Sequence, residues 1–192
     1  MSHSSYARLM AVDRSQTLHA AAALLTRKST ATMDEVAKAA GISRATLHRH
    51  FAGRDALVRA LEELGIQECE AALDRAALDS GPAEDALRRL IRELEAAAPL
   101  LAFLNTESQL FEGEEQHAGW ARMDARMAAL FRRGQESGEF RIDLTPAWLC
   151  EALYGLVASA AWAVQDGRVA AKDFSYMIAE LLLGGARRSV EP

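Results

Sequence analysis

Apolar residues recur along most of the chain at intervals of three and four positions, which is the period of an α-helix. No segment shows the alternation of β-branched and polar residues that predicts a strand, and alanine and leucine dominate the apolar positions. The pattern predicts an all-α fold of about nine helices. The first is placed at about 13–27, two short ones flank a turn between Thr32 and His50, and the others are placed at about 54–78, 83–98, 100–111, 116–137, 146–166 and 170–183.

The two short helices are indicated by their start and stop signals. Thr32 is followed three residues later by Glu35, which is the spacing of a capping box at a helix start. Gly41 suits the left-handed conformation in which many helices end. Ser43 can cap a second helix, predicted at Arg44–His50.

The apolar positions of these short helices predict one shared core. Val36 and Ala37 lie on one face of the first helix, and Leu47 and Phe51 lie one turn apart along the second. Ala37 is small enough to let two helices cross closely beside a short turn. We therefore predict a helix-turn-helix whose second helix carries its polar side chains outward.

Charge divides the chain into two parts that we call the head (residues 1–61) and the body (residues 62–192). The head holds nine Lys and Arg residues against four acids, a balance of +5, and the body holds 13 basic and 23 acidic residues, a balance of −10. A basic surface is what DNA binding requires, because neutralised phosphates release counterions. The head is therefore the predicted DNA-binding part.

The segment from residue 32 to 57 resembles the DNA-binding domain of the tetracycline-repressor (TetR) family of bacterial regulators. The matching positions are Val36-Ala37, Ala40-Gly41-Ile42-Ser43, Thr46-Leu47, His50-Phe51, Arg54 and Leu57. The family usually has a small residue at the position of Ala45, tyrosine at that of His48 and lysine at that of Arg54. The resemblance covers about 14–64. It implies a DNA-binding domain at 1–56 and an effector-binding and dimerisation domain at 57–192, joined by the long helix at 54–78.

The expected DNA contacts follow from this resemblance and from the places of the residues on the two short helices. They are Thr32, Ser43, Arg44, Ala45, Thr46, His48, Arg49, His50 and Arg54. Thr32 and Ser43 stand at helix starts, where each caps its helix, contacts a phosphate or does both. Arg44 and Thr46 are best placed for base edges. The phosphate candidates are His48, Arg49, His50 and Arg54, and for Arg49 a solvated surface charge is the alternative.

A homodimer on a palindromic double-stranded operator is expected, because one recognition helix contacts few base pairs and half-sites lie one turn, ~34 Å, apart. The segment 144–164 carries Glu151 as its one charge and approaches the length of a membrane span. A helix apolar all round is more often buried between subunits, although covering its own core is the alternative. The expected interface residues are Leu149, Leu153, Leu156, Val157, Ala160, Phe174, Met177, Ile178 and Leu181.

The resemblance also implies a ligand cavity among the helices of the body. Its candidate lining residues are Phe103, Glu107, Phe111, Trp120, Asp124, Trp148 and Trp162. Carboxylates beside aromatic rings suit a lipophilic cation, as in a regulator of an efflux pump. A neutral or acyl ligand stays open, and aromatic residues at helical spacing are also common in plain cores.

Other classes of protein are disfavoured by what the sequence lacks. Cys69 and Cys150 are far apart and fit reduced core residues. His48 and His50, two positions apart on a helix, point in different directions and suit no metal. No nucleophile or phosphate-binding motif is present, so we predict a protein that is not an enzyme and has no cofactor or metal.

Without a signal peptide the protein is expected to be cytoplasmic. A DNA-binding protein without a ligand is the remaining alternative.

Overall fold

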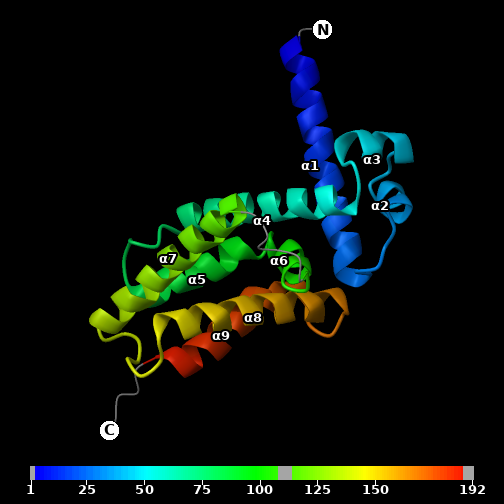
Figure 1. The fold of residues 1–192 in the computed structure, drawn as a ribbon. Coiled ribbons are helices and arrows are strands. Elements are labelled where there is room, and N and C mark those ends of the chain that lie inside the picture. The colour runs from blue at the N-terminus through cyan, green and yellow to red at the C-terminus, as the bar shows by residue number, and fades with distance from the viewer. Residues whose placement is uncertain (1–2, 108–113, 188–192) are drawn as a thin grey trace.

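A computed structural model describes residues 3–107 and 114–187 (Figure 1). Within these ranges the regular structure consists of nine α-helices and one 3₁₀ turn, η1 (Ala171–Asp173), which confirms the all-α prediction. The helices are α1 (His3–Arg27), α2 (Met33–Ala39), α3 (Arg44–His50), α4 (Arg54–Ala76), α5 (Ala83–Leu94), α6 (Ala98–Leu104), α7 (Glu114–Glu136), α8 (Pro146–Gln165) and α9 (Phe174–Ala186).

Several helix boundaries differ from the prediction. Helix α5 ends at Leu94 rather than near residue 98, and α9 spans Phe174–Ala186 rather than 170–183. Helix α1 begins at His3 rather than near residue 13, because no glycine or proline interrupts residues 3–13. Helix α6 spans Ala98–Leu104 rather than 100–111. Pro99 lies in its first turn, where the missing N–H removes no helical hydrogen bond, so proline opens this helix instead of preceding it. The predicted end of that helix, including Phe111, lies outside the described residues.

The buried apolar residues form two separate cores, and α4 contributes side chains to both. The first core joins α1, α2 and α3 to Leu57 and Leu61 of α4 and to Phe103 of α6. The second joins the rest of α4, from Ile66 to Ala76, to α5, α7, α8 and α9. Figure 1 shows α1 rising from the body with α2 and α3 against its side, while α4 runs across the body from the base of the head. The head is thus attached to the body through α4 and α6.

Helix α8 is long and apolar enough to cross a membrane, as the sequence suggested, but it packs within the protein. It contacts α6, α7 and α9. One face, carrying Leu149, Leu153 and Val157, is buried against these neighbours. By length and composition it is the one such helix among the described residues. Its contacts with three other helices are those of a packed helix of the body, and a role between subunits stays a prediction.

Both cysteines are buried and free, as predicted. Burial raises the pKa of the Cys69 thiol to about 12, and burial does the same for Cys150. The thiolate is the reactive form, so neither side chain is a nucleophile near neutral pH.

Candidate nucleic-acid interface and effector cavity

Helix α2 begins with the predicted capping box. The Thr32 hydroxyl accepts a hydrogen bond from the backbone N–H of Glu35 at 3.3 Å, and the Glu35 carboxylate accepts one from the Thr32 N–H at 2.8 Å. The Lys28 ammonium donates to the other Glu35 oxygen at 2.6 Å, and this contact lowers the pKa of Glu35 to about 2. The start of α2 is therefore fixed by side chains on both sides of the preceding turn.

The turn into α3 also has the predicted geometry. Gly41 adopts a φ of +68°, where a side chain would be strained. The Ser43 hydroxyl accepts a hydrogen bond from the backbone N–H of Thr46 at 3.1 Å, which caps α3. Leu47 is fully buried, as is Phe51 just past the end of the helix. This anchoring turns the opposite face of α3 to solvent.

The exposed face of α3 presents most of the predicted DNA contacts. Arg44, Ala45, His48 and Arg49 are exposed, and Thr46 is partly buried. The Arg44 guanidinium lies 3.1 Å from the carboxylate of Asp34 on α2, with 70% of the Arg44 side chain exposed. An exposed ion pair contributes little to stability, so Arg44 can exchange this partner for a base edge at little cost.

The remaining two phosphate candidates are less exposed. His50 is partly buried and its ring packs against that of Phe51, with 6.1 Å between centroids. Arg54, at the start of α4, donates to the backbone oxygens of Ser29 at 2.7 Å and Ala31 at 3.2 Å. Its guanidinium also lies 3.3 Å from the carboxylate of Glu107, just after α6. Arg54 therefore joins the α1–α2 turn, the start of α4 and the end of α6.

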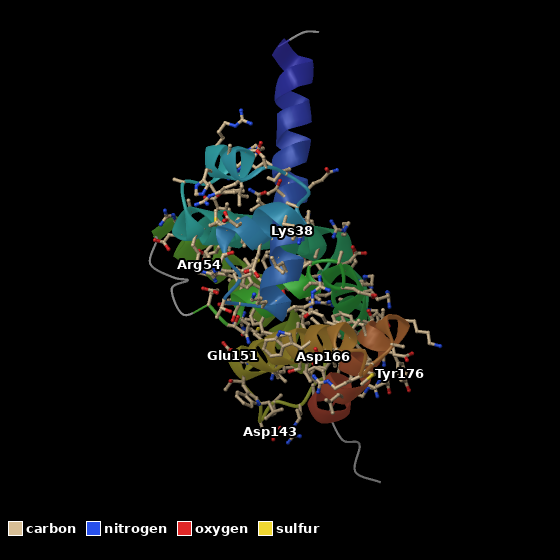
Figure 2. All side chains as sticks on the ribbon, turned by 90° about the vertical axis from the view of Figure 1, so that its right-hand side faces the viewer. Lys38, Arg54, Asp143, Glu151, Asp166 and Tyr176 are labelled. Carbon is tan, nitrogen blue, oxygen red and sulfur yellow. The ribbon has the colours of Figure 1, made fainter. Side chains whose placement is uncertain are left out.

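This ion pair changes the prediction for Glu107. Glu107 was expected in the effector cavity because Phe103 lies one turn before it, but the structure pairs it with Arg54, which is distant in sequence. Only 15% of the Glu107 side chain is exposed, against 39% for Arg54. In Figure 2, Lys38 and Arg54 lie toward the helix-turn-helix, and Glu151 lies further into the body. Lys38 is a further exposed cation of the helix-turn-helix, on α2, that was not among the predicted DNA contacts.

Replacing Arg54 by alanine is expected to weaken binding to every DNA sequence by a similar factor, roughly tenfold, because hydrogen bonds that fix the head are lost. Anisotropy titrations on several duplexes at a series of salt concentrations measure this. Glu107→Gln is the matched variant and should cost less, since Arg54 keeps its two carbonyl acceptors. A change of sequence preference in Arg54→Ala would contradict the expectation. If the slope of log affinity against log salt concentration also falls by about one per half-site, Arg54 contacts a phosphate directly as well.

A cavity of about 240 Å³ lies among α6, α7 and α8. Its described lining consists of Leu101, Leu104, Asn105, Trp120, Asp124, Glu151, Tyr154 and Val157. Of the predicted residues, the structure brings Trp120 and Asp124 to this cavity. Asp124 and Glu151 are the charged side chains of this lining, and both are acidic.

Four predicted ligand contacts are not on the described lining. Phe103 is fully buried in the core that joins the head to α6, so its ring serves packing. Trp148 lies on the outer surface with 61% of the residue exposed. Trp162 packs against the core of the body, and Glu107 pairs with Arg54. Aromatic content alone therefore did not distinguish cavity residues from core and surface residues.

The polar side chains of the cavity are held in place by hydrogen bonds. The Tyr154 hydroxyl donates to the Asp124 carboxylate at 2.9 Å, and burial together with this carboxylate raises the pKa of Tyr154. The indole N–H of Trp120 donates to the carboxylate of Glu62 on α4 at 2.9 Å. Glu151 and Tyr154 were not predicted as cavity residues from the sequence. Their spacing of three positions on an otherwise apolar helix was the available signal.

Apart from the cavity, an exposed apolar surface lies over α8 and α9. Trp148, Met177 and Leu181 are 61%, 45% and 67% exposed. Trp148 and Leu181 line a shallow groove together with Leu156 and residues of both helices. Exposed apolar surface of this kind marks protein interaction sites.

The predicted interface residues are divided by the structure into two groups. Five of them are buried in the core of their own chain, which corrects the expectation that they face a partner: Leu149, Leu153, Val157, Phe174 and Ile178. Of the other four, Met177 and Leu181 are exposed, and Leu156 and Ala160 are partly buried against the core of the body. Both helices are apolar on most sides, so periodicity did not show which side faces the core.

A helix-turn-helix presented by a basic head on an acidic helical body defines a DNA-binding regulator. Residues 18–61 match the model of the family described as bacterial regulatory proteins, tetR family. Over 171 residues the chain is 33% identical to the HTH-type transcriptional regulator NfxB of Pseudomonas aeruginosa, covering 88% of this chain and 91% of that one. The chain belongs to the TetR family. It is a transcriptional regulator and not an enzyme, as the sequence predicted.

Another relative is the HTH-type transcriptional repressor LfrR of Mycolicibacterium smegmatis, 29% identical over 150 residues that cover 78% of each chain. The crystal structure of LfrR in complex with proflavine superposes with a TM-score of 0.74 and 26% identity, covering 92% of this chain and 97% of that one. The regulator PfmR of Thermus thermophilus has a TM-score of 0.68 and 26% identity, covering 90% and 99%. These likenesses extend across head and body.

Proposed function

We propose that this regulator is a repressor that binds a palindromic operator as a homodimer and releases it when a lipophilic aromatic cation occupies the cavity among α6, α7 and α8. It acts in the cytoplasm, where its operator is. The name of LfrR supports repression, and the proflavine bound by that relative is a planar aromatic cation.

The observation that carries the ligand class is the chemistry of the cavity wall. Trp120 and Tyr154 supply aromatic surface, and Asp124 and Glu151 supply negative charge. Within the described lining there is no lysine, arginine or histidine to neutralise these acids. A cation gains from both features, because it is attracted to carboxylates and to the faces of aromatic rings.

The cavity is also placed where occupancy can affect the head. Leu104 of α6 lines the cavity and packs against α4 at Gly65, where a Cβ atom would lie 2.5 Å from a Leu104 methyl group. Two residues after the lining residue Asn105, Glu107 contacts Arg54. A ligand that shifts α6 therefore acts on the start of α4, which carries the helix-turn-helix.

Cation binding is expected to quench tryptophan fluorescence, because Trp120 lines the cavity. The first experiment titrates the purified protein, without DNA, with proflavine and with acridone, a neutral tricyclic control. We expect saturable binding of proflavine at least about tenfold tighter than that of acridone, since cation–π and ionic attraction are lost in the neutral compound. Equal affinities would contradict the cationic class.

Release of DNA is tested separately, because proflavine itself binds DNA. The operator is first selected from genomic fragments and footprinted. Tetraphenylphosphonium, a bulky lipophilic cation, is expected to dissociate the complex, and neutral triphenylphosphine oxide is not. If cations bind the protein but leave operator affinity unchanged, the chain is a DNA-binding protein that does not respond to this ligand class.

A further inference from the structure

Glu62 is a buried acid whose role neither the fold nor DNA binding explains. It lies on α4 with 3% of the residue exposed. Its carboxylate accepts a hydrogen bond from the indole N–H of Trp120 at 2.9 Å. In the part of the chain that the structure describes, no cationic side chain forms an ion pair with it. A buried carboxylate whose hydrogen-bond donor is neutral is costly, so a cation bound nearby would stabilise it.

Trp120 places this charge next to the cavity. Trp120 lines the cavity and its indole N–H donates to the Glu62 carboxylate, so this one side chain joins the cavity wall to the buried acid. Trp120 packs against both apolar cores, which limits the orientations of its ring. The carboxylate of Glu62 is therefore one hydrogen bond away from a residue of the effector site's wall.

A carboxylate in this position increases the attraction of the wall for a cation in two ways. Accepting a hydrogen bond from the indole N–H polarises the ring and makes its face more negative, which strengthens a cation–π contact. The negative charge also acts through space on the cavity, and burial leaves little water to screen it. A neutral ligand gains from neither effect.

We propose that Glu62 is a specificity-determining residue that makes the cavity selective for positively charged aromatic ligands through Trp120. The inference rests on the proposed function, because it concerns the same cavity. It adds a residue of α4 to a site whose described lining comes from α6, α7 and α8. The ligand class is a planar aromatic compound with a delocalised positive charge that stacks on the indole.

The test compares affinities of wild type and Glu62→Gln for proflavine and acridone, measured by fluorescence titration of the full chain. Glutamine keeps an oxygen that accepts the Trp120 hydrogen bond and nearly the same volume, but removes the charge. We expect a loss of proflavine affinity of roughly tenfold, because a buried charge acts through a low effective dielectric. Acridone affinity should stay within about twofold, since the hydrogen bond that orients the indole is kept.

Glu63→Gln is the matched control, because the same change of charge is then made at an exposed neighbour on the same helix. It should leave both affinities unchanged. Glu62→Asp keeps the charge and shortens the side chain, so it should retain the preference for proflavine over acridone even if both affinities fall. This variant gives the answer if Glu62→Gln does not fold, as checked by its thermal melting.

The outcomes separate this inference from the proposed function. If the wild type does not prefer proflavine to acridone, the cationic ligand class is wrong and the inference fails with it. If the wild type prefers proflavine and Glu62→Gln keeps that preference in full, the proposed function stands and Glu62 only orients the indole. Loss of the preference in Glu62→Asp would also overturn the inference.

Discussion

Replacing Arg44 by alanine is expected to change the DNA sequence that the protein prefers and to weaken binding to its own operator by roughly 30-fold or more. A bidentate arginine–guanine contact contributes about 1–3 kcal/mol, and a dimer makes two such contacts. Arg44 is the first residue of α3, its side chain is 70% exposed, and Leu47 turns that face of the helix away from the core. Its ion pair with Asp34 is exposed, so losing that pair should change the stability of the fold very little.

The measurement is a competition assay at fixed salt, with the operator labelled and a set of operators altered at single base pairs as competitors. The largest change in relative affinity should fall at one position in each half-site, and its symmetry should follow the palindrome. Arg132→Ala is the control, since this arginine is exposed on α7 of the body. Unchanged relative affinities across the set would show that Arg44 does not contact base edges.

Replacing Leu181 by arginine is expected to give a monomer and to lower operator affinity by about 100-fold or more. In a dimer the first bound head holds the second close to its half-site, and a monomer loses this effective concentration. Leu181 is 67% exposed and lines the groove over α8 and α9 together with Trp148. A charge placed in such a surface must be desolvated when the interface forms, without a partner to compensate it. The fold of the single chain should be retained, since the side chain faces solvent.

Sedimentation at micromolar concentration gives the oligomeric state, and gel shifts on the footprinted operator give the affinity. Ala125→Arg is the matched control: Ala125 is exposed on α7, and the described lining of the groove includes no residue of that helix. It should leave both the dimer and the affinity unchanged. A wild-type monomer would refute the dimer, and a dimer broken by Ala125→Arg but kept by Leu181→Arg would place the interface elsewhere.

The helix-turn-helix could be predicted closely because its determinants are local. The capping of α2 by Thr32, the positive φ of Gly41 and the capping of α3 by Ser43 each depend on residues within three or four positions. Buried Leu47 and Phe51 then fix which face of α3 is exposed. The start of α1 was predicted too late. No glycine or proline interrupts residues 3–13, so the helix begins ten residues earlier, at His3.

The sites in the body were predicted less well because their determinants are distant in sequence. Glu107 is taken out of the cavity by Arg54, 53 positions earlier, and no helical period indicates such a pair. Glu62 and Trp120 meet although 58 positions separate them. The side of each apolar helix that faces a partner was likewise not predictable, since it depends on how α8 and α9 pack within their own chain. Packing between distant helices, rather than local propensity, decides these positions.

The burial of both thiols has a practical consequence for testing whether a ligand moves the two heads of the proposed dimer. Cys69 and Cys150 are the two cysteines of the chain, and each is buried with its pKa raised to about 12. They should therefore resist maleimide labelling under native conditions. A single cysteine introduced at exposed Ala45 would carry one dye or spin label on each recognition helix. The distance between the two labels would then measure the separation of the heads directly, with and without ligand.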